Sequence, residues 1–344
     1  MAGTYRFSFG PWNLHEGADP FGPPVRPGLE FARKLKMYKQ LGFDGVQFHD
    51  DDAVPDLENC SPAEIVKKAS EVKKMLDGEG LVAEFVAPRL WESPHGIDGA
   101  YTSNDPGCRQ WAMDRSRRAV DIANALGTRL IVLWLAREGT YIREAKNAIV
   151  AYQQLLDAVN NFLEYDEHVE IAIEPKPNEP MDHAYLPTIG HALALAERSS
   201  SPKRVGGLIE TAHAILAGLD PSDEMAFALS LGKLWSVHLN DQNGLKFDQD
   251  KTFGAANLRA AFNQVRVLEL GNYAATGRFV GLDVKAMRTQ KAGQAQQHLS
   301  NSRAIFLKLV DKVRSVPKDI EQQCLATRDY EALELHVIEH LLGG

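Results

Sequence analysis

The chain has 344 residues, of which 44% are hydrophobic and 24% charged, and its formal net charge is −8. This length suits a single large α/β barrel, and the composition is that of an ordinary globular protein. The negative charge, without a dense run of lysine or arginine, argues against nucleic acid and anionic membranes as partners.

Short apolar runs alternate with longer amphipathic stretches, which predicts strands alternating with helices. The predicted strands are Tyr5–Trp12, Asp44–His49, Leu81–Ala87, Arg129–Trp134, Val169–Glu174, Val205–Glu210, Leu234–Leu239 and Phe279–Asp283. The predicted helices are Glu30–Leu41, Pro62–Gly78, Arg109–Leu126, Arg143–Tyr165, Thr188–Arg198, Pro221–Leu231, Ala255–Val267 and Gln290–Arg314. Ser61 and Glu64 form a capping box before the second helix.

Eight strands, most of them followed by a helix, predict an α/β fold that closes as a (β/α)₈ TIM barrel. An open doubly wound sheet is the alternative, but the sequence lacks the glycine-rich phosphate-binding turn expected there. We assign residues 1–314 to the barrel. Residues 315–344 have a helical pattern and are expected to pack outside the barrel or on a neighbouring subunit.

The cysteines and the N-terminus indicate a cytoplasmic protein. Cys60, Cys108 and Cys324 are scattered without the spacing of metal ligands, as expected of reduced thiols. The first residues lack the apolar stretch of a signal peptide, and no apolar run is long enough to cross a bilayer.

Polar residues follow the predicted strands at the point where each strand ends. In a TIM barrel these carboxyl ends meet at one rim, where active sites form. The residues placed there are His49 and Asp52 after the second strand, Trp134 after the fourth, Glu174 and Lys176 after the fifth, Glu210 after the sixth, His238 in the seventh, and Asp283 and Lys285 after the eighth. Solvated loop charge explains any one of them, but their common position favours an active site.

Two short patterns indicate metal binding. Glu210 and His213 are three residues apart, so that in a helical turn both side chains can reach one ion. Asp248 and Asp250 are separated by one residue in a loop, where their carboxylates either bind a cation together or are simply charged groups on the surface. Carboxylates with one or two imidazoles suit Mg²⁺, Mn²⁺ or Co²⁺. Trp12, Phe21 and Trp134 lie near strand ends. They either pack in the core or form an apolar lining of the active site.

Several motifs occur in the order found in one known family. They are Phe48–Asp52, Leu133–Trp134 with Arg137–Gly139, Glu174–Pro180, Leu186–Thr188 with Gly190–Ala192, Phe247–Asp250 with Phe253–Gly254, and Asp283-x-Lys285 with Arg288–Thr289. Together they resemble the xylose isomerase family in its shorter, actinobacterial-type form. The resemblance implies a (β/α)₈ barrel that interconverts an aldose and a 2-ketose by a hydride shift between C1 and C2 of an open-chain sugar.

The resemblance also implies two divalent cations per subunit, Mn²⁺, Co²⁺ or Mg²⁺. One site would take Glu174, Glu210, His238 and Asp283, and the second would take Glu210 as a bridge, His213, Asp248 and Asp250. His49, oriented by Asp52, would assist ring opening, and Lys176 would hydrogen-bond the substrate carbonyl oxygen. Trp12, Trp134 and Lys285 would contact the sugar, and Phe21 would reach in from a neighbouring subunit of a homodimer or homotetramer.

The chain departs from the family pattern in two informative places. His238 stands where xylose isomerases have an aspartate, as in the related rhamnose isomerases, and the lost negative charge favours Mn²⁺ or Co²⁺ over Mg²⁺. The segment Phe85–Trp91 also differs, in the region that touches the far hydroxyls of the sugar. The natural sugar therefore stays open, as do two other functions: a sugar epimerase or lyase on the same barrel, and a non-catalytic sugar-binding protein.

Overall fold

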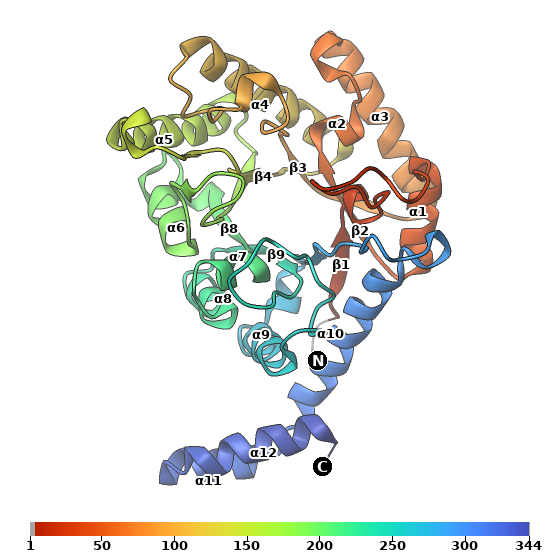
Figure 1. Ribbon diagram of the computed structural model, residues 1–344, viewed down its shortest axis with the longest axis vertical. Helices are drawn as coiled ribbons and strands as arrows, with labels where there is room; N and C mark the ends of the chain where they lie inside the picture. The colour runs from red at the N-terminus through yellow and green to blue at the C-terminus, as the bar shows by residue number, and fades with distance from the viewer. Residues whose placement is uncertain (1–3, 344) are drawn as a thin grey trace.

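The computed structural model describes residues 4–343, and within them the predicted TIM barrel is present (Figure 1). Its strands are β1 (Arg6–Phe9), β2 (Gly45–His49), β3 (Val82–Ala87), β4 (Leu130–Trp134), β6 (Glu170–Glu174), β8 (Val205–Glu210), β9 (Leu234–Leu239) and β10 (Phe279–Leu282). They pair in parallel in this order, and β10 pairs with β1 to close the barrel. Two short strands, β5 (Gly139–Thr140) and β7 (His183–Ala184), form a separate antiparallel pair.

Most of the helices surround the barrel and connect its strands, and the last two follow it (Figure 1). They are α1 (Phe31–Gln40), α2 (Asp50–Ala53), α3 (Pro62–Glu79), α4 (Pro106–Leu126), α5 (Ala148–Tyr165), α6 (Ile189–Arg198), α7 (Thr211–Leu216), α8 (Pro221–Ser230), α9 (Leu258–Leu270), α10 (Gln297–Ser315), α11 (Lys318–Thr327) and α12 (Tyr330–Leu342). The predicted capping box at α3 is present, because the Glu64 carboxylate accepts from Ser61 N and Ser61 Oγ accepts from Glu64 N.

Several predicted elements begin or end elsewhere, and in three of them a turn replaces part of the predicted length. The first strand stops at Phe9 because Pro11 begins a 3₁₀ turn, Pro11–Asn13. The helix predicted from Arg143 starts at Ala148, where the Asn147 side chain accepts from the first free backbone N–H groups. The helix predicted from Gln290 starts at Gln297. In each case a turn at the element's edge replaces part of the predicted length.

The core has two apolar layers. Strand residues facing outward, such as Phe7, Val46 and Ile171, pack against the helices in one large cluster. Strand residues facing inward form a smaller cluster inside the barrel, which contains Phe85 and Trp235. This arrangement fixes the strands rigidly and presents their carboxyl ends as one rim.

The contact between the first and last strands is stabilised by sheet pairing and by a side chain beyond the strands. Ser8 pairs with Gly281 in the sheet. Beyond the strands, the Arg26 guanidinium donates to three carbonyl oxygens of the segment after β10, those of Ala286 (3.2 Å), Met287 (2.9 Å) and Gln290 (2.7 Å). The loop after β1 is thereby fastened to the loop after β10, and both loops border the rim.

Helices α11 and α12 lie outside the barrel, beyond α10 (Figure 1). Ion pairs join them to α9, between Arg266 and Glu321 at 2.5 Å and between Arg259 and Glu334 at 2.7 Å. Leu335 and other apolar side chains of α12 remain exposed. Over residues 4–343, none of the helices combines the length and hydrophobicity that crossing a membrane requires.

Buried His298 makes the stability of the fold depend on pH. Its Nε2 lies 3.2 Å from the Asn13 carbonyl oxygen, so Nε2–H donates and Nδ1 carries no proton. Burial lowers the pKa of His298 from 6.5 to about 4. Between pH 6.5 and 4 the unfolded chain binds more protons at this residue than the folded chain does. The contribution of His298 to the free energy of unfolding is therefore complete above pH 6.5 and is lost as the pH falls toward 4.

We therefore expect acidification from pH 6.5 to 4 to remove up to about 3 kcal/mol of stability through His298. Denaturant melts at several pH values measure this slope. The His298→Asn variant keeps a donor for the Asn13 carbonyl oxygen and should show a shallower slope. Equal slopes for the two proteins would contradict the assignment.

Candidate metal centre

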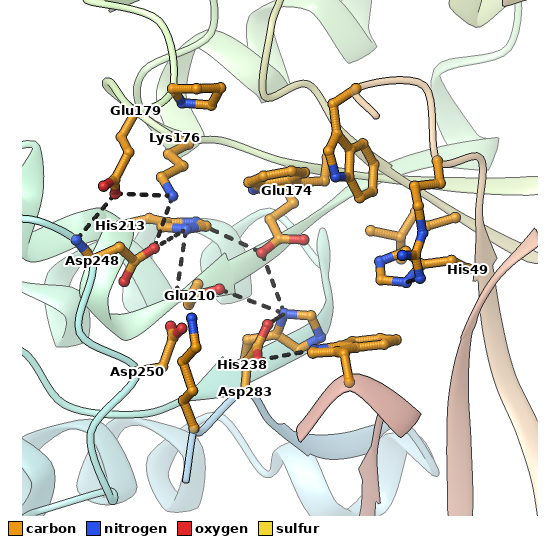
Figure 2. Close-up of a pocket in the computed structure, with 18 of the residues that line it drawn as sticks. His49, Glu174, Lys176, Glu179, Glu210, His213, His238, Asp248, Asp250 and Asp283 are labelled. Atoms are coloured by element: carbon orange, nitrogen blue, oxygen red, sulfur yellow. Dashed lines mark hydrogen bonds and ion pairs between the residues drawn. The ribbon is translucent and has the colours of Figure 1, made fainter. Parts of the chain in front are cut away.

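A cavity of about 460 Å³ opens at the carboxyl ends of the barrel strands. Acidic, imidazole, lysine and tryptophan side chains line it. Figure 2 shows the labelled carboxylates, His213 and His238 close together, with His49 across the cavity from them. The predicted site residues found in its lining are Trp12, His49, Trp134, Glu174, Lys176, Glu210, His213, His238, Asp248, Asp250, Asp283 and Lys285. Residues from distant parts of the sequence therefore meet at one rim, as the strand ends predict.

Glu174, Glu210 and Asp283 gather around the imidazole of His238. Glu174 is the last residue of β6, Glu210 is the last residue of β8, and Asp283 directly follows β10. The Nδ1 atom of His238 lies 3.2 Å from Glu174 Oε1, 3.7 Å from Glu210 Oε2 and 3.9 Å from Asp283 Oδ2. All four side chains are the ones that the resemblance assigns to the first cation.

The residues assigned to the second cation lie on the other side of Glu210. His213 stands in the first turn of α7, and its Nε2 is 3.3 Å from Glu210 Oε1 and 3.1 Å from Asp248 Oδ2. Asn240 also donates to Glu210 Oε1, at 2.9 Å, and fixes the orientation of that carboxylate. Glu210 thus turns one oxygen toward each set of residues.

Three groups among residues 4–343 have donor atoms within 4.8 Å of one another, close enough to share an ion. They are Glu174 with Glu210 and His213, Glu210 with His238 and Asp283, and Glu210 with Asp248 and Asp250. Glu210 belongs to every group. The structure therefore brings all the predicted ligands together around this one carboxylate.

The centre holds more negative charge than its own side chains neutralise. Burial raises the pKa of Glu210 and of Asp250 well above the ordinary range, and the Asp248 carboxylate adds to both shifts. Burial also raises the pKa of Asp283. Crowded buried carboxylates are stable when a cation lies among them. Asp248 Oδ1 is buried and has no hydrogen-bond partner within residues 4–343, which leaves an oxygen free for such a cation. The donor set fits divalent metal ions.

Lys176 lies close to two carboxylates of the cavity. Its Nζ lies 2.8 Å from Asp248 Oδ2, 3.6 Å from Glu179 Oε2 and 5.3 Å from the centre of the Trp134 ring. Burial alone would lower the pKa of Lys176, but the charge of Asp248 raises it above its ordinary value. Lys176 consequently stays protonated and presents a positive charge to the cavity.

His49 lies on the opposite wall, with two partners instead of one. Its Nδ1 is 3.1 Å from Asp52 Oδ2, the predicted partner, and 2.6 Å from Arg89 Nη2. Arg89 also contacts Asp52 Oδ1 at 3.2 Å. Although burial opposes it, hydrogen bonding to His49 lowers the pKa of Asp52. Asp52 and Arg89 thus both contact the Nδ1 edge of the His49 ring, and Arg89 was not among the predicted site residues.

Aromatic rings close the cavity. The Trp12 ring lies tilted against His49, with 4.3 Å between ring centres, and its Nε1 donates to Asp283 Oδ1 at 3.0 Å. Trp91, which ends the divergent segment Phe85–Trp91 but was not itself among the predicted site residues, packs edge-on against Trp134 at 4.5 Å. Phe21 is 98% exposed and lies outside the cavity of its own chain. Its predicted place in a neighbouring subunit's site stays a prediction.

Glu179 was likewise not among the predicted site residues. It lies at the cavity's edge with φ of +60°, and its carboxylate accepts from Asp248 N at 3.0 Å as well as facing Lys176. It thereby connects the segment after β6 to the loop that carries Asp248. Arg89, Trp91 and Glu179 all lie within five residues of a strand end, so position relative to the strands was the signal that could have found them.

The fold and this cluster define a TIM barrel with an acidic, imidazole-containing centre at the carboxyl ends of its strands. The chain belongs to the family described as the xylose isomerase-like TIM barrel, which matches residues 35–296. A xylose isomerase from Thermus thermophilus is 34% identical over 331 residues, covering 95% of this chain and 84% of that enzyme. The predicted fold and the resemblance to xylose isomerases are confirmed at the level of this family, whereas the shorter, actinobacterial-type form stays a prediction.

Solved structures share the fold at lower identity. A 3-keto-D-glucoside 4-epimerase from E. coli has a TM-score of 0.63 and 15% identity, over 88% of this chain and 100% of that one. A D-psicose 3-epimerase has a TM-score of 0.64 and 13% identity, over 89% and 99% of the two chains. At these identities the likeness concerns the barrel alone.

Proposed function

We propose that this protein is an aldose–ketose isomerase that uses two divalent cations. The main support is Glu210, which belongs to every group of residues able to share an ion within residues 4–343. The similarity to a xylose isomerase over 95% of the chain supports the same reaction class. Glu174, His238 and Asp283 would complete one site, and His213, Asp248 and Asp250 the other. His238 contributes no negative charge when neutral, which favours Mn²⁺ or Co²⁺ over Mg²⁺.

The reaction moves a hydride from C2 to C1 of an open-chain sugar. The C2 hydroxyl loses its proton as C2 becomes a carbonyl, and the C1 oxygen gains one. Bound cations supply positive charge for the two oxygens on which negative charge develops. Lys176 donates a hydrogen bond to the substrate carbonyl oxygen, and Trp12 and Trp134 keep water away from the reacting carbons.

His49 has a separate role, at the stage of ring opening. A cyclic sugar must give up its anomeric hydroxyl proton before it reacts. His49 can take up that proton through Nε2 in the tautomer in which Nδ1–H donates to Asp52 Oδ2, 3.1 Å away. The ring is therefore positioned for acid–base chemistry before substrate arrives.

A sugar epimerase is the second candidate, because several structural neighbours are 3- or 4-epimerases. Epimerisation needs a base on each face of the substrate carbon. Lys176, a protonated side chain 2.8 Å from Asp248, suits carbonyl polarisation better than proton abstraction. The isomerase is therefore preferred.

Isotope transfer separates these functions. We expect a panel of pentoses, hexoses and 6-deoxyhexoses with Mn²⁺, Co²⁺ or Mg²⁺ to reveal a substrate. When that sugar carries deuterium at C2, the ketose should retain the label at C1 after turnover in water. Loss of the label to solvent would instead support proton exchange, as in epimerases. Turnover unaffected by EDTA would exclude the metal-dependent reaction.

A further inference from the structure

One ring nitrogen of His49 faces two partners of opposite kind. Its Nδ1 lies 2.6 Å from Arg89 Nη2 and 3.1 Å from Asp52 Oδ2. A guanidinium only donates hydrogen bonds, and a carboxylate only accepts them. A neutral imidazole carries its single proton on one of its two nitrogens, so Nδ1 can bond to only one of these partners at a time. The partner it bonds to decides which nitrogen presents a proton to the cavity.

The contacts of Nδ1 favour Arg89 as its partner. With a proton on Nδ1, two N–H groups would point at each other across 2.6 Å, whereas a bare Nδ1 accepts a short, charge-assisted hydrogen bond there. Asp52 does not need the ring proton, because its Oδ2 accepts from His49 N at 3.0 Å and its Oδ1 accepts from Arg89 Nη2 at 3.2 Å. Both partners are therefore satisfied when the imidazole proton is on Nε2.

Neighbouring carboxylates hold the Arg89 guanidinium against the imidazole. Its Nε lies 3.0 Å from Asp51 Oδ1, and its Nη1 lies 3.2 Å from Glu92 Oε1. The backbone N–H of Arg89 donates to Asp50 Oδ1 at 3.1 Å. Acidic residues of α2 and of the segment after β3 thus surround this one arginine, and together they keep it beside the ring.

Two tryptophan rings pack against the imidazole and restrict its rotation. The Trp12 ring lies 4.3 Å from it and the Trp91 ring lies 5.2 Å from it, edge-on, between ring centres. His49 lines the cavity, across from the labelled carboxylates (Figure 2), and Nε2 is the nitrogen left for a substrate. An Nε2–H in this place donates a hydrogen bond to a sugar oxygen but cannot take up a proton.

We propose that Arg89 is a positioning residue for His49: it donates to Nδ1 and keeps the imidazole of the substrate-free protein in the tautomer that carries its proton on Nε2. His49 then presents a hydrogen-bond donor to the cavity instead of a base. The tautomer follows from these contacts, whereas its effect on catalysis rests on the proposed function.

In that function, Arg89 restrains ring opening. The proton of the anomeric hydroxyl would pass to Nε2 and then to the ring oxygen, as the bond between C1 and the ring oxygen breaks. Nε2 must be bare to receive it. Nδ1 must therefore first exchange its bond from Arg89 for one to Asp52, with the imidazole proton moving from Nε2 to Nδ1 through solvent.

The test is the ¹⁵N spectrum of histidine-labelled protein in the presence of Mg²⁺. Long-range ¹H–¹⁵N correlations measure the tautomer directly, because a bare imidazole nitrogen and an N–H nitrogen differ widely in ¹⁵N shift. The chain has 11 histidines, and a His49→Asn spectrum identifies the signals of His49 by their absence. We expect a bare Nδ1 and an Nε2–H in the wild type. A proton on Nδ1 in the wild type would overturn the proposal.

Variants at the two competing partners separate their effects. Arg89→Met removes the donor, so Nδ1 should gain the proton, bond to Asp52, and exchange its ¹⁵N shift with that of Nε2. Asp52→Asn should keep the wild-type pattern, because the bond from Arg89 remains. An unchanged pattern in Arg89→Met, or a reversed one in Asp52→Asn, would show that Arg89 does not set the tautomer.

Arg278→Met is the matched control. Arg278 is also partly buried and ion-paired, 3.1 Å from Glu170, but both residues lie at the amino ends of the barrel strands, away from the cavity. The signals of His49 should not change in this variant, and a change would mean that the tautomer responds to any lost arginine. The measurement needs no sugar, so its outcome is independent of the isotope experiment that tests the isomerase.

Discussion

Replacing Glu210 with glutamine should lower the occupancy of both cations and reduce turnover by at least about 100-fold. Glu210 Oε1 faces His213 at 3.3 Å, and Glu210 Oε2 faces His238 at 3.7 Å. An amide replaces one of these oxygens with an NH₂ group, which cannot bind a cation. Because the same carboxylate serves both sites, the loss cannot be confined to one of them.

Elemental analysis of the Glu210→Gln protein after dialysis measures this effect directly. Glu138→Gln is the control, because Glu138 is also buried but binds the backbone N–H groups of Ala100, Tyr101 and Thr102. It should lose stability and keep its metal content. Two equivalents of metal per chain in Glu210→Gln would rule out a bridging carboxylate.

Replacing Lys176 with methionine should reduce kcat by about 100- to 1,000-fold, the usual effect of removing one donor that stabilises developing negative charge. Methionine preserves most of the buried volume and removes the charge. The KM should change much less, because the hydrogen bond strengthens as charge develops on the substrate oxygen. Steady-state kinetics on the sugar identified by the substrate panel supply both constants.

Two comparisons make the Lys176 result interpretable. Asp248 Oδ2 loses a partner at 2.8 Å in Lys176→Met, so metal content must be measured on the same sample. Lys176→Arg retains a positive charge with a different reach and should fall between the wild type and Lys176→Met. A fully metallated Lys176→Met protein with a kcat within about threefold of the wild type would remove Lys176 from the reaction, given the loss expected for such a donor.

The sequence was sufficient for the barrel because its strands are short apolar runs that end in charged residues. Glu174 and Glu210 each follow a buried run, and both end a barrel strand in the structure. The first strand was predicted too long, since an apolar run continues through Pro11 although the proline begins a turn. Periodicity therefore located the strands, and local turn chemistry decided where they stop.

The site was predictable where spacing or strand position fixed the geometry. Glu210 and His213 meet because Glu210 ends β8 and a helical turn follows at once. Asp248 and Asp250 lie in a long loop, and only the family resemblance placed them near the other ligands. No local rule shows which way the segment after β3 turns, so the contact of Arg89 with His49 could not be foreseen.

Closure of the barrel between β1 and β10 has a consequence for biosynthesis. Asp283 follows β10 directly, and its Oδ1 accepts from Trp12 Nε1 and Asn13 Nδ2, which follow β1. During translation, β1 must wait for almost the entire polypeptide to be made before its last neighbour appears. Until then the growing sheet has unpaired edges, the kind of surface that invites aggregation. The proposed ligand set is completed by the same strand that removes those edges, so under the proposed function a nascent chain could bind cations only once its sheet has closed.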